Sequence, residues 1–289
     1  MDGDDSDLDD SALDDFLLAA LAEDLDEAGD ITSLATIPAE ARARAHFVAR
    51  EAGCIAGLGP ALRVFELVSD DVATAARVAD GDLVGAGDAL ATVEGPARAI
   101  LAGERVALNL LGLLSGVATA TRQLVDAVDG TAATIIDTRK TVPLLRRLQK
   151  AAVVAGGGRN HRMGLYDQVL IKDNHIEAVG SAAEAVRRAR AFVDETLDAQ
   201  VLVEVEIERV DQLEGVIEAG ADIVMLDNMD PSEMRKAVEL AGGRVLLEAS
   251  GGITLETVRA VAESGVDMIS VGALTHSAPS LDVGLDFEG

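Results

Sequence analysis

Six short apolar runs, each followed by a segment that can form a helix, constrain the fold of this chain more than any other feature. They lie at 134–137, 169–172, 201–207, 223–227, 245–248 and 268–271. Short buried strands that alternate with helices indicate right-handed βαβ units and a parallel sheet. Six such units in succession favour closure into a barrel over a doubly wound sheet.

Polar residues or glycines fall at or just after the C-terminal end of each run. They are Asp137 to Lys140, Lys172 to His175, Glu204 with Glu206, Asp227 with Asn228, Glu248 with Ser250 to Gly252, and Gly272. In a parallel barrel this is the face where the βα loops build the active site. One or two such residues could be ordinary strand-ending groups, but six in succession predict a functional site.

The chain before these units has a different pattern. Residues 1–12 are predicted to be a disordered acidic tail, and a helix is expected from Leu13 to Ala28. Strand-like runs at 45–49, 54–56 and 89–93 are separated by glycines, with one helix near 60–67. This pattern predicts a sheet-containing N-terminal domain over 13–112, a barrel over 113–275 and a C-terminal segment over 276–289. A long helix is expected from Ile100 to Val128, with a break near Gly112–Gly116.

The charge of the chain excludes two classes of partner. With 51 acidic and 24 basic residues, the net charge of −27 would repel nucleic acids and anionic membranes. Acidic excess with only four lysines is typical of a halophilic protein in a high-salt cytoplasm, and an ordinary acidic bacterial protein is the alternative. The single cysteine, Cys54, and the absence of a signal-like segment around Phe16 to Leu21 predict a cytoplasmic protein.

Positive charge is concentrated in one window of this acidic chain. Residues 139–172 contain eight basic side chains and one acidic residue, Asp167, and they hold three of the four lysines. A solvated basic helix face would be unusual in such a chain. The window therefore predicts an Arg, Lys and His cluster that binds a phosphate- or carboxylate-bearing substrate.

Two glycine-rich segments indicate how that anion is held. Ser250-Gly251-Gly252 is expected to lead into a helix near Thr254, and with Gly272 it suits a phosphate that approaches backbone N–H groups. Three glycines at 156–158 precede His161 and Arg162, and could bring the backbone close to a ligand. Arginine and histidine donors in this segment suit a substrate with two carboxylates.

Carboxylates in an anion site need a different explanation. Glu206 and Asp227 follow adjacent strands, so they are expected to bind ribose hydroxyls or Mg²⁺, which takes one or two carboxylates together with substrate phosphates. A zinc site is disfavoured because His161, His175 and Cys54 lie on separate segments.

Seven ordered motifs resemble one enzyme family. They are Asp-Thr-Arg-Lys-Thr-x-Pro at 137–143, Gly-Gly-Gly-Arg-Asn-His-Arg at 156–162, Leu-Ile-Lys-Asp-Asn-His at 170–175, Glu-Val-Glu at 204–206, Leu-Asp-Asn at 226–228, Glu-Ala-Ser-Gly-Gly at 248–252 and Val-Gly-Ala-Leu-Thr-His at 271–276. This series resembles quinolinate phosphoribosyltransferase. The resemblance implies an N-terminal α/β sandwich and an open six-stranded parallel α/β barrel. It also implies the conversion of quinolinate and phosphoribosyl pyrophosphate, with Mg²⁺, to nicotinate mononucleotide, pyrophosphate and CO2.

The resemblance also implies roles for individual residues. Quinolinate would be bound by Arg139, His161, Arg162 and Lys172, with Arg105 supplied by a second subunit of a homodimer or larger homo-oligomer. Lys140 would face the pyrophosphate, and Glu206 and Asp227 the ribose and metal. The substrate-binding set also includes Thr138, Ser250, Gly251, Gly252 and Gly272; the catalytic set is Lys140, Lys172, Glu206 and Asp227.

Three alternatives stay open at this point. A paralogue with the same fold could act on another aromatic acid, although Arg139, His161 and Arg162 together favour quinolinate. An anion-sensing protein without catalysis should have lost Lys140, Glu206 or Asp227, and none is lost. Nicotinate phosphoribosyltransferase acts on a substrate with one carboxylate, which needs fewer positive groups.

Overall fold

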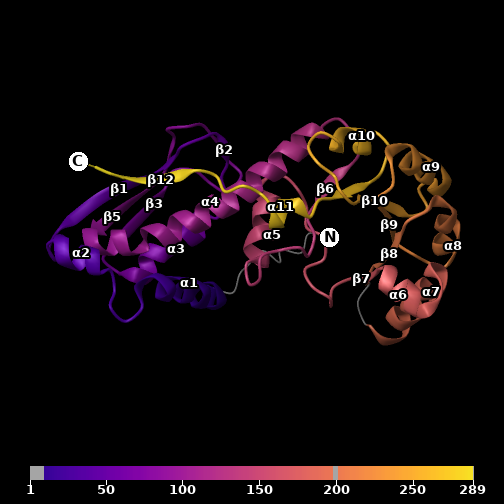
Figure 1. The fold of residues 1–289 in the computed structure, drawn as a ribbon, viewed down its shortest axis with the longest axis horizontal. Helices are drawn as coiled ribbons and strands as arrows, with labels where there is room; N and C mark the ends of the chain where they lie inside the picture. Colours follow the sequence, from indigo (N-terminus) through magenta and orange to yellow (C-terminus); the bar gives the residue numbers. More distant parts are fainter. Residues whose placement is uncertain (1–9, 198–200, 289) are drawn as a thin grey trace. The chain divides into compact units, whose positions relative to one another are not determined.

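A computed structural model describes residues 10–197 and 201–288 of the chain (Figure 1). Residues 1–9 of the predicted acidic tail lie outside the described residues. The tail was predicted three residues too long, because helix α1 (Asp10–Leu25) begins at Asp10. Acidic residues are favourable in the first turn of a helix, where they meet the positive end of its dipole.

The chain forms two compact units. The sandwich unit contains residues 10–122, 147–157 and 277–288, and the barrel unit contains Gln123–Arg146 and Gly158–His276. The predicted domains followed chain order, whereas in the structure two later segments belong with the first unit. The C-terminal segment does so because strand β12 (Val283–Phe287) pairs antiparallel with β1 (Arg42–Ala49).

The sandwich unit contains a four-stranded antiparallel sheet in the order β12-β1-β5-β3, with β5 at Ala89–Pro96 and β3 at Ala73–Ala76. Strands predicted at 45–49 and 89–93 are confirmed, while 54–56 shrinks to a two-residue strand, β2 (Gly53–Cys54), which pairs with β4 (Leu83–Val84). The short helices are α2 (Ile31–Thr36), α3 (Leu58–Val68) and α5 (Arg146–Ala155). The sequence did not predict β3 or β12.

Helix α4 (Ala97–Ala127) runs for 31 residues without interruption, so the break predicted near Gly112–Gly116 is wrong. Those glycines instead let the C-terminal segment cross the helix closely. A Cβ at Gly116 would lie 2.0 Å from the carbonyl oxygen of Pro279. By length and composition α4 could cross a membrane, but 61% of its apolar window is buried, as in a core helix.

The barrel unit is built on a six-stranded parallel sheet in the order β6-β11-β10-β9-β8-β7. The strands are β6 (Thr134–Ile136), β7 (Val169–Ile171), β8 (Val203–Ile207), β9 (Ile223–Asp227), β10 (Leu246–Ser250) and β11 (Met268–Ser270). All six predicted strands are therefore confirmed. Because β6 and β7 are both edge strands, the barrel is open, as expected.

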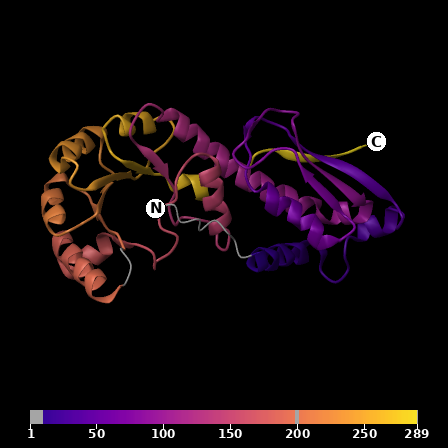
Figure 2. The same ribbon diagram turned by 180° about the vertical axis from the view of Figure 1, so that it is seen from behind.

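Helices cover the outer side of this curved sheet. Figures 1 and 2 show α7 (Ala182–Thr196), α8 (Leu213–Glu218), α9 (Pro231–Ala241) and α10 (Val258–Ala262) along its outer rim, seen from opposite sides. The remaining elements are α6 (Asp173–Val179), the 3-10 turn η1 (Val210–Gln212) and α11 (Ala273–His276).

Alternation along β8 decides what faces the inside of the barrel. Val203, Val205 and Ile207 are fully buried and share one face of the strand. Successive side chains of a strand point to opposite faces, so Glu204 and Glu206 lie on the other face. Two glutamates are thereby directed into the barrel.

Candidate active site

A pocket of about 610 Å³ lies in the barrel unit at the C-terminal ends of the strands. Eleven residues predicted from the sequence line it, and five further residues complete it. The predicted residues are Thr138, Arg139, Lys140, His161, Arg162, Lys172, Glu206, Asp227, Ser250, Gly251 and Gly252; the others are Leu170, Met225, Asn228, Glu248 and Ser270. The structure therefore brings together most of the predicted site.

Two predicted residues are not part of this lining. Gly272 adjoins the pocket through Lys140, because a Cβ at Gly272 would lie 2.9 Å from the Cδ atom of Lys140. Arg105 is exposed on α4 in the sandwich unit.

The loop after β6 is held in place by its own polar groups. The hydroxyl of Thr138 accepts a hydrogen bond from the Lys140 N–H at 3.0 Å. The Thr275 hydroxyl donates to the Lys140 carbonyl at 2.7 Å. Buried Asp137 accepts from the His161 N–H at 2.9 Å. These bonds connect the two segments that carry Arg139 and Arg162.

Residues 158–162 run beside β6 at the open edge of the sheet. Arg159 forms a parallel bridge with Ile136, and its N–H donates to the Ile135 carbonyl at 2.9 Å. This pairing brings His161 and Arg162 into the barrel. The expectation that the preceding glycines approach a ligand is wrong for Gly156, where a Cβ would lie 2.4 Å from the Ala118 carbonyl of α4.

The cations of the pocket come from three segments. Burial, and then the nearby charge of Arg139, lower the pKa of Arg162. The buried Nε of Arg139 has no hydrogen-bond partner among the described residues. Lys172 ion-pairs with Glu206, with 2.8 Å between Nζ and Oε2. Two guanidinium groups held close to one another form a strong site for an anion.

Only half of the basic window faces the pocket. Of its eight cations, Arg139, Lys140, Arg162 and Lys172 line it. Arg146 donates instead to the Met163 carbonyl at 3.0 Å, and Lys150 is fully buried in α5. The window predicted the correct region but overestimated the charge available to a ligand.

The glycine turn after β10 lies against the end of β9. Gly251 has φ +98°, and a Cβ there would lie 2.2 Å from Oδ1 of Asn228, so only glycine fits without displacement. The helix expected near Thr254 begins four residues later, at Val258. A helix N-terminus therefore does not follow the glycines directly.

Glu206 and Asp227 belong to adjacent strands, as predicted. Glu206 is paired in register with Met225 of β9, and Asp227 lies two residues further along that strand. One oxygen of Asp227 accepts from the Asn228 side chain at 2.6 Å. Each carboxylate thus has one oxygen bound to a donor and a second that can bind a cation or a hydroxyl. This donor set is compatible with Mg²⁺, which prefers oxygen ligands.

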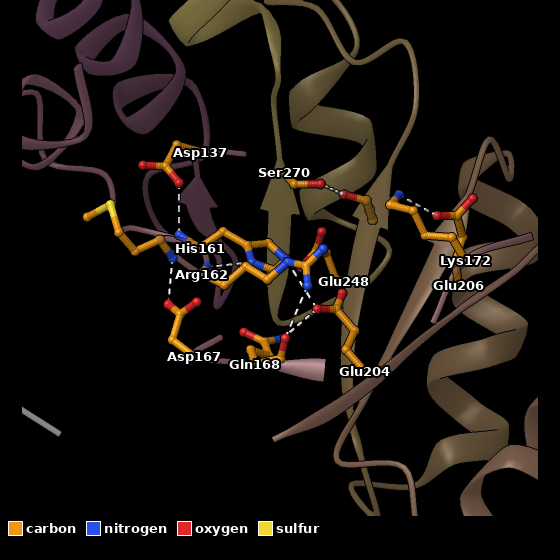
Figure 3. Close-up of polar contacts among 12 residues, drawn as sticks. Asp137, His161, Arg162, Asp167, Gln168, Lys172, Glu204, Glu206, Glu248 and Ser270 are labelled. Carbon is orange, nitrogen blue, oxygen red and sulfur yellow. Dashed lines mark hydrogen bonds and ion pairs between the residues drawn. The ribbon is translucent and has the colours of Figure 1, made fainter. Parts of the chain in front are cut away.

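A buried acidic cluster lies beside the cations (Figure 3). The Nε2 atom of His161 is 3.1 Å from Glu204 Oε2 and 3.5 Å from Glu248 Oε2. The Gln168 side chain donates to Glu204 Oε2 at 2.6 Å. Burial raises the pKa of Glu204 to about 7, and burial followed by the charge of Glu204 raises that of Glu248 to about 8.

The sequence placed Glu204 and Glu248 at strand ends but predicted no role for either. The sequence pattern that could have indicated a buried role is that each glutamate lies between two apolar residues of a strand. Among the described residues, His161, Glu204 and Glu248 also form a group whose ligand atoms lie within 4.8 Å of one another, close enough for a metal ion.

Comparisons with known proteins agree with this architecture. The family model described as "Quinolinate phosphoribosyl transferase, N-terminal domain" matches residues 30–115, and the one for the C-terminal domain matches residues 117–286. A probable nicotinate-nucleotide pyrophosphorylase [carboxylating] of Bacillus subtilis is 46% identical over 89% of this chain and 88% of its own. The Mycobacterium leprae enzyme of that name is 45% identical over 97% of this chain and 99% of its own.

A solved structure shows the same fold over nearly the whole length. The nicotinate-nucleotide pyrophosphorylase of Francisella tularensis superimposes with a TM-score of 0.92 at 37% identity, covering 98% of both chains. Both halves of the sequence and the fold therefore lead to the same conclusion: the chain belongs to the quinolinate phosphoribosyl transferase family.

Proposed function

We propose that this chain transfers the phosphoribosyl group of phosphoribosyl pyrophosphate to the ring nitrogen of quinolinate and releases CO2 and pyrophosphate. The product is nicotinate mononucleotide, a precursor in de novo NAD synthesis. The observation that carries this proposal is the pocket in which Arg139, Arg162 and Lys172 converge within a chain of net charge −27.

Quinolinate would bind at the side of the pocket formed by these three cations and His161. Each charge-assisted hydrogen bond to a carboxylate contributes about 1.5–3 kcal/mol. Two carboxylates on adjacent ring carbons can use several of them at once. The Nδ1 atom of His161 accepts from the Arg162 N–H at 2.6 Å, so the ring is a neutral wall of this subsite.

Phosphoribosyl pyrophosphate would occupy the other side. Ser250, Gly251, Gly252 and Gly272 would receive the 5′-phosphate, and Thr138 and Lys140 would face the pyrophosphate. Glu206 and Asp227 would bind the ribose hydroxyls and hold Mg²⁺, which supplies charge neutralisation for the leaving group.

This arrangement requires no nucleophilic side chain. The pyridine nitrogen attacks the anomeric carbon while the bond to pyrophosphate breaks. The residues orient the two substrates, and Lys140 stabilises the negative charge that develops on the leaving oxygen, so catalysis comes from positioning and electrostatics. Lys172 is held by Glu206 at the junction of the two subsites.

We also propose a homodimer or larger homo-oligomer in which Arg105 enters the pocket of a second copy. Arg105 is exposed on α4. Loops that flank the pocket residues expose apolar side chains: Leu144 is 91% exposed, Leu165 73% and Tyr166 75%. Large apolar groups exposed together on a surface are typical of protein–protein interfaces. Light scattering of the pure protein measures the assembly, and a monomer at working concentration contradicts this part.

The composition supports a halophilic enzyme of the cytoplasm. Screening over a few ångströms at molar salt reduces the repulsion among the many carboxylates. Activity and folding should therefore increase with KCl into the molar range, and full activity in dilute buffer contradicts the salt requirement.

The decisive experiment supplies quinolinate or nicotinate with phosphoribosyl pyrophosphate and Mg²⁺ in high KCl. Nicotinate mononucleotide and CO2 from quinolinate alone support the proposed reaction. Product from nicotinate alone indicates the single-carboxylate substrate instead. If neither substrate gives product, the fold assignment stands, and the substrate is another aromatic acid, as in a paralogue.

A further inference from the structure

Arg146 belongs to the basic window, but it does not line the pocket. Its side chain is half-buried, and its guanidinium donates to a hydroxyl and to carbonyl oxygens rather than to a carboxylate. In a chain with 51 acidic residues this use of an arginine needs an explanation. Helix stability does not supply one. Helix α5 begins at Arg146, and a cation at this end of a helix opposes the positive end of the dipole.

The guanidinium group of Arg146 connects two segments that carry cations of the pocket. Its Nε donates to the Thr141 hydroxyl at 3.0 Å, and its Nη2 donates to the Arg139 carbonyl at 3.4 Å. Its Nη1 donates to the carbonyl of Met163, the residue after Arg162, at 3.0 Å. The donors of a guanidinium lie in one plane and point in fixed directions. Arg146 therefore sets how far the backbone of Arg139 lies from the backbone of Arg162.

The turn before α5 directs Arg146 back toward the loop after β6. The Leu145 N–H donates to the Val142 carbonyl at 3.1 Å, which closes the turn. Leu144 has φ +68°, a left-handed conformation that is unfavourable for a bulky residue. Its side chain is 91% exposed, so packing within the subunit does not compensate for this strain. Strain of this kind persists where the surrounding structure enforces it, often at functional sites.

Arg146 is the second of two links between the same segments. Asp137 joins them through the His161 N–H at 2.9 Å, on the N-terminal side of both Arg139 and Arg162. Arg146 joins them on the C-terminal side. One link alone would leave the segments free to pivot about it. Two links, one on each side of the arginines, fix both the distance between the segments and their relative orientation.

The two pocket arginines need such a link because they carry like charges. Burial, and then the charge of Arg139, disfavour the charged form of Arg162 and lower its pKa. Two guanidinium groups that repel one another will separate unless their backbones are held. Bonds from Arg146 to the carbonyl of Arg139 and to the carbonyl after Arg162 hold them without placing a carboxylate in the anion site.

We propose that Arg146 is a positioning residue that sets the spacing of Arg139 and Arg162, and thereby the preference for two carboxylates on adjacent ring carbons. This inference rests on the proposed function and deepens it by naming a source of substrate specificity. The ring of such a substrate is rigid, so the distance between its carboxylates is fixed. Charge-assisted hydrogen bonds depend on distance and angle, and cations at another spacing cannot bind both carboxylates well.

The test compares two probes that differ only in the spacing of their carboxylates, benzene-1,2-dicarboxylate and benzene-1,3-dicarboxylate. Titration calorimetry of the full chain in high KCl measures the Kd of each probe without turnover. Arg146→Lys keeps the charge, but its single nitrogen cannot join both segments. Arg235→Lys, at an exposed position of α9, is the matched control. Since a displacement of about 1 Å can cost about 100-fold, we expect Arg146→Lys to weaken binding of the 1,2-isomer by about 10- to 100-fold.

Wild type and Arg235→Lys should keep a preference for the 1,2-isomer that Arg146→Lys loses. Kinetics give a second measurement, in which Arg146→Lys should raise the KM for quinolinate and leave the KM for phosphoribosyl pyrophosphate unchanged. The reason is that Lys140, on the phosphate side, is held independently by the hydroxyls of Thr138 and Thr275.

Two further variants test the link itself. Thr141→Val removes the hydroxyl that accepts from Arg146 and should reduce the preference in the same direction, whereas Thr141→Ser keeps a hydroxyl and should retain it. In an Arg162→Ala background, Arg146→Lys should have little further effect, because the group that it positions is gone. Additive effects of Arg162→Ala and Arg146→Lys contradict the proposal.

Each other outcome has a defined meaning. If Arg146→Lys weakens both isomers equally, or raises both KM values equally, its role is only structural and the proposal is overturned. If wild type binds both isomers equally, the proposal fails together with the two-carboxylate subsite of the proposed function. If wild type prefers the 1,2-isomer but forms no product from quinolinate, the proposed reaction fails, and the binding comparison still decides the role of Arg146. If Arg146→Lys does not fold, Thr141→Val replaces it, and an unchanged preference overturns the proposal.

Discussion

Replacing Glu248 by glutamine should make the stability of the protein less dependent on pH. The pKa of this carboxyl is raised from its ordinary value of 4.5 to about 8 by burial and then by the charge of Glu204. Between these values the folded protein keeps a proton that the unfolded chain releases. The stabilisation is therefore complete below about pH 4.5 and is lost as the pH rises toward 8.

The magnitude follows from proton linkage. The proton that the folded protein keeps and the unfolded chain releases lowers the free energy of unfolding by roughly 1.4 kcal/mol for each unit that the pH rises. The loss is about 4 kcal/mol between pH 5 and 8. Glutamine resembles the neutral carboxyl and does not ionise, so the variant should lack this loss. Near pH 5 the two proteins should be almost equally stable, and near pH 8 the variant should be the more stable by a few kcal/mol.

Urea unfolding followed by circular dichroism at several pH values measures this difference. The slope of unfolding free energy against pH is compared among wild type, Glu248→Gln and the surface control Glu239→Gln. The reasoning is refuted if wild type and Glu248→Gln lose stability in parallel between pH 5 and 8. Such a result would mean that Glu248 is ionised in the folded protein.

Three further predictions concern the two subsites and the assembly. Arg162→Ala should raise the KM for quinolinate by about 10- to 100-fold, since it loses a charge-assisted contact, whereas Lys140→Ala should mainly lower kcat. Equal effects on both parameters would count against this division. Gly251→Ala should weaken phosphoribosyl pyrophosphate binding and cost about 1–3 kcal/mol of stability, and Gly252→Ala, where a Cβ meets nothing within 4 Å, should cost less. Mixing equal amounts of inactive Arg105→Ala and Lys140→Ala subunits should restore about a quarter of the wild-type activity to the mixture, because about half of the dimers are hybrids and each hybrid has one intact site of two; no recovery would exclude a shared site.

The barrel could be predicted because its strands are marked locally. Each is a short apolar run that ends in a polar residue or a glycine, and parallel strands place those ends on one face. The small-residue strand β3 and the C-terminal strand β12 were missed for a different reason. β12 pairs with β1, some 240 residues earlier in the chain, and no local pattern encodes such a partner.

The site was predictable in composition but not in its protonation. Residue types and spacing identified eleven of the lining residues. They could not show that Lys150 is buried or that Arg146 binds a backbone carbonyl, since both depend on packing. Nor could they show that two buried glutamates meet at the His161 ring, which arises because β8 and β10 direct single carboxyl groups into one barrel.

This arrangement explains how one pocket can serve two steps with opposite demands on charge. Ribosyl transfer needs cations that hold a dianion, and those cations would retain the carboxylate that must leave. A neutral carboxyl group at the floor offers no further attraction to the departing carboxylate. The charge on Glu204 keeps Glu248 protonated, and burial of the pair keeps that charge from being screened by solvent. The acidic cluster is therefore part of the electrostatic design of the pocket, even though Glu204 does not line it.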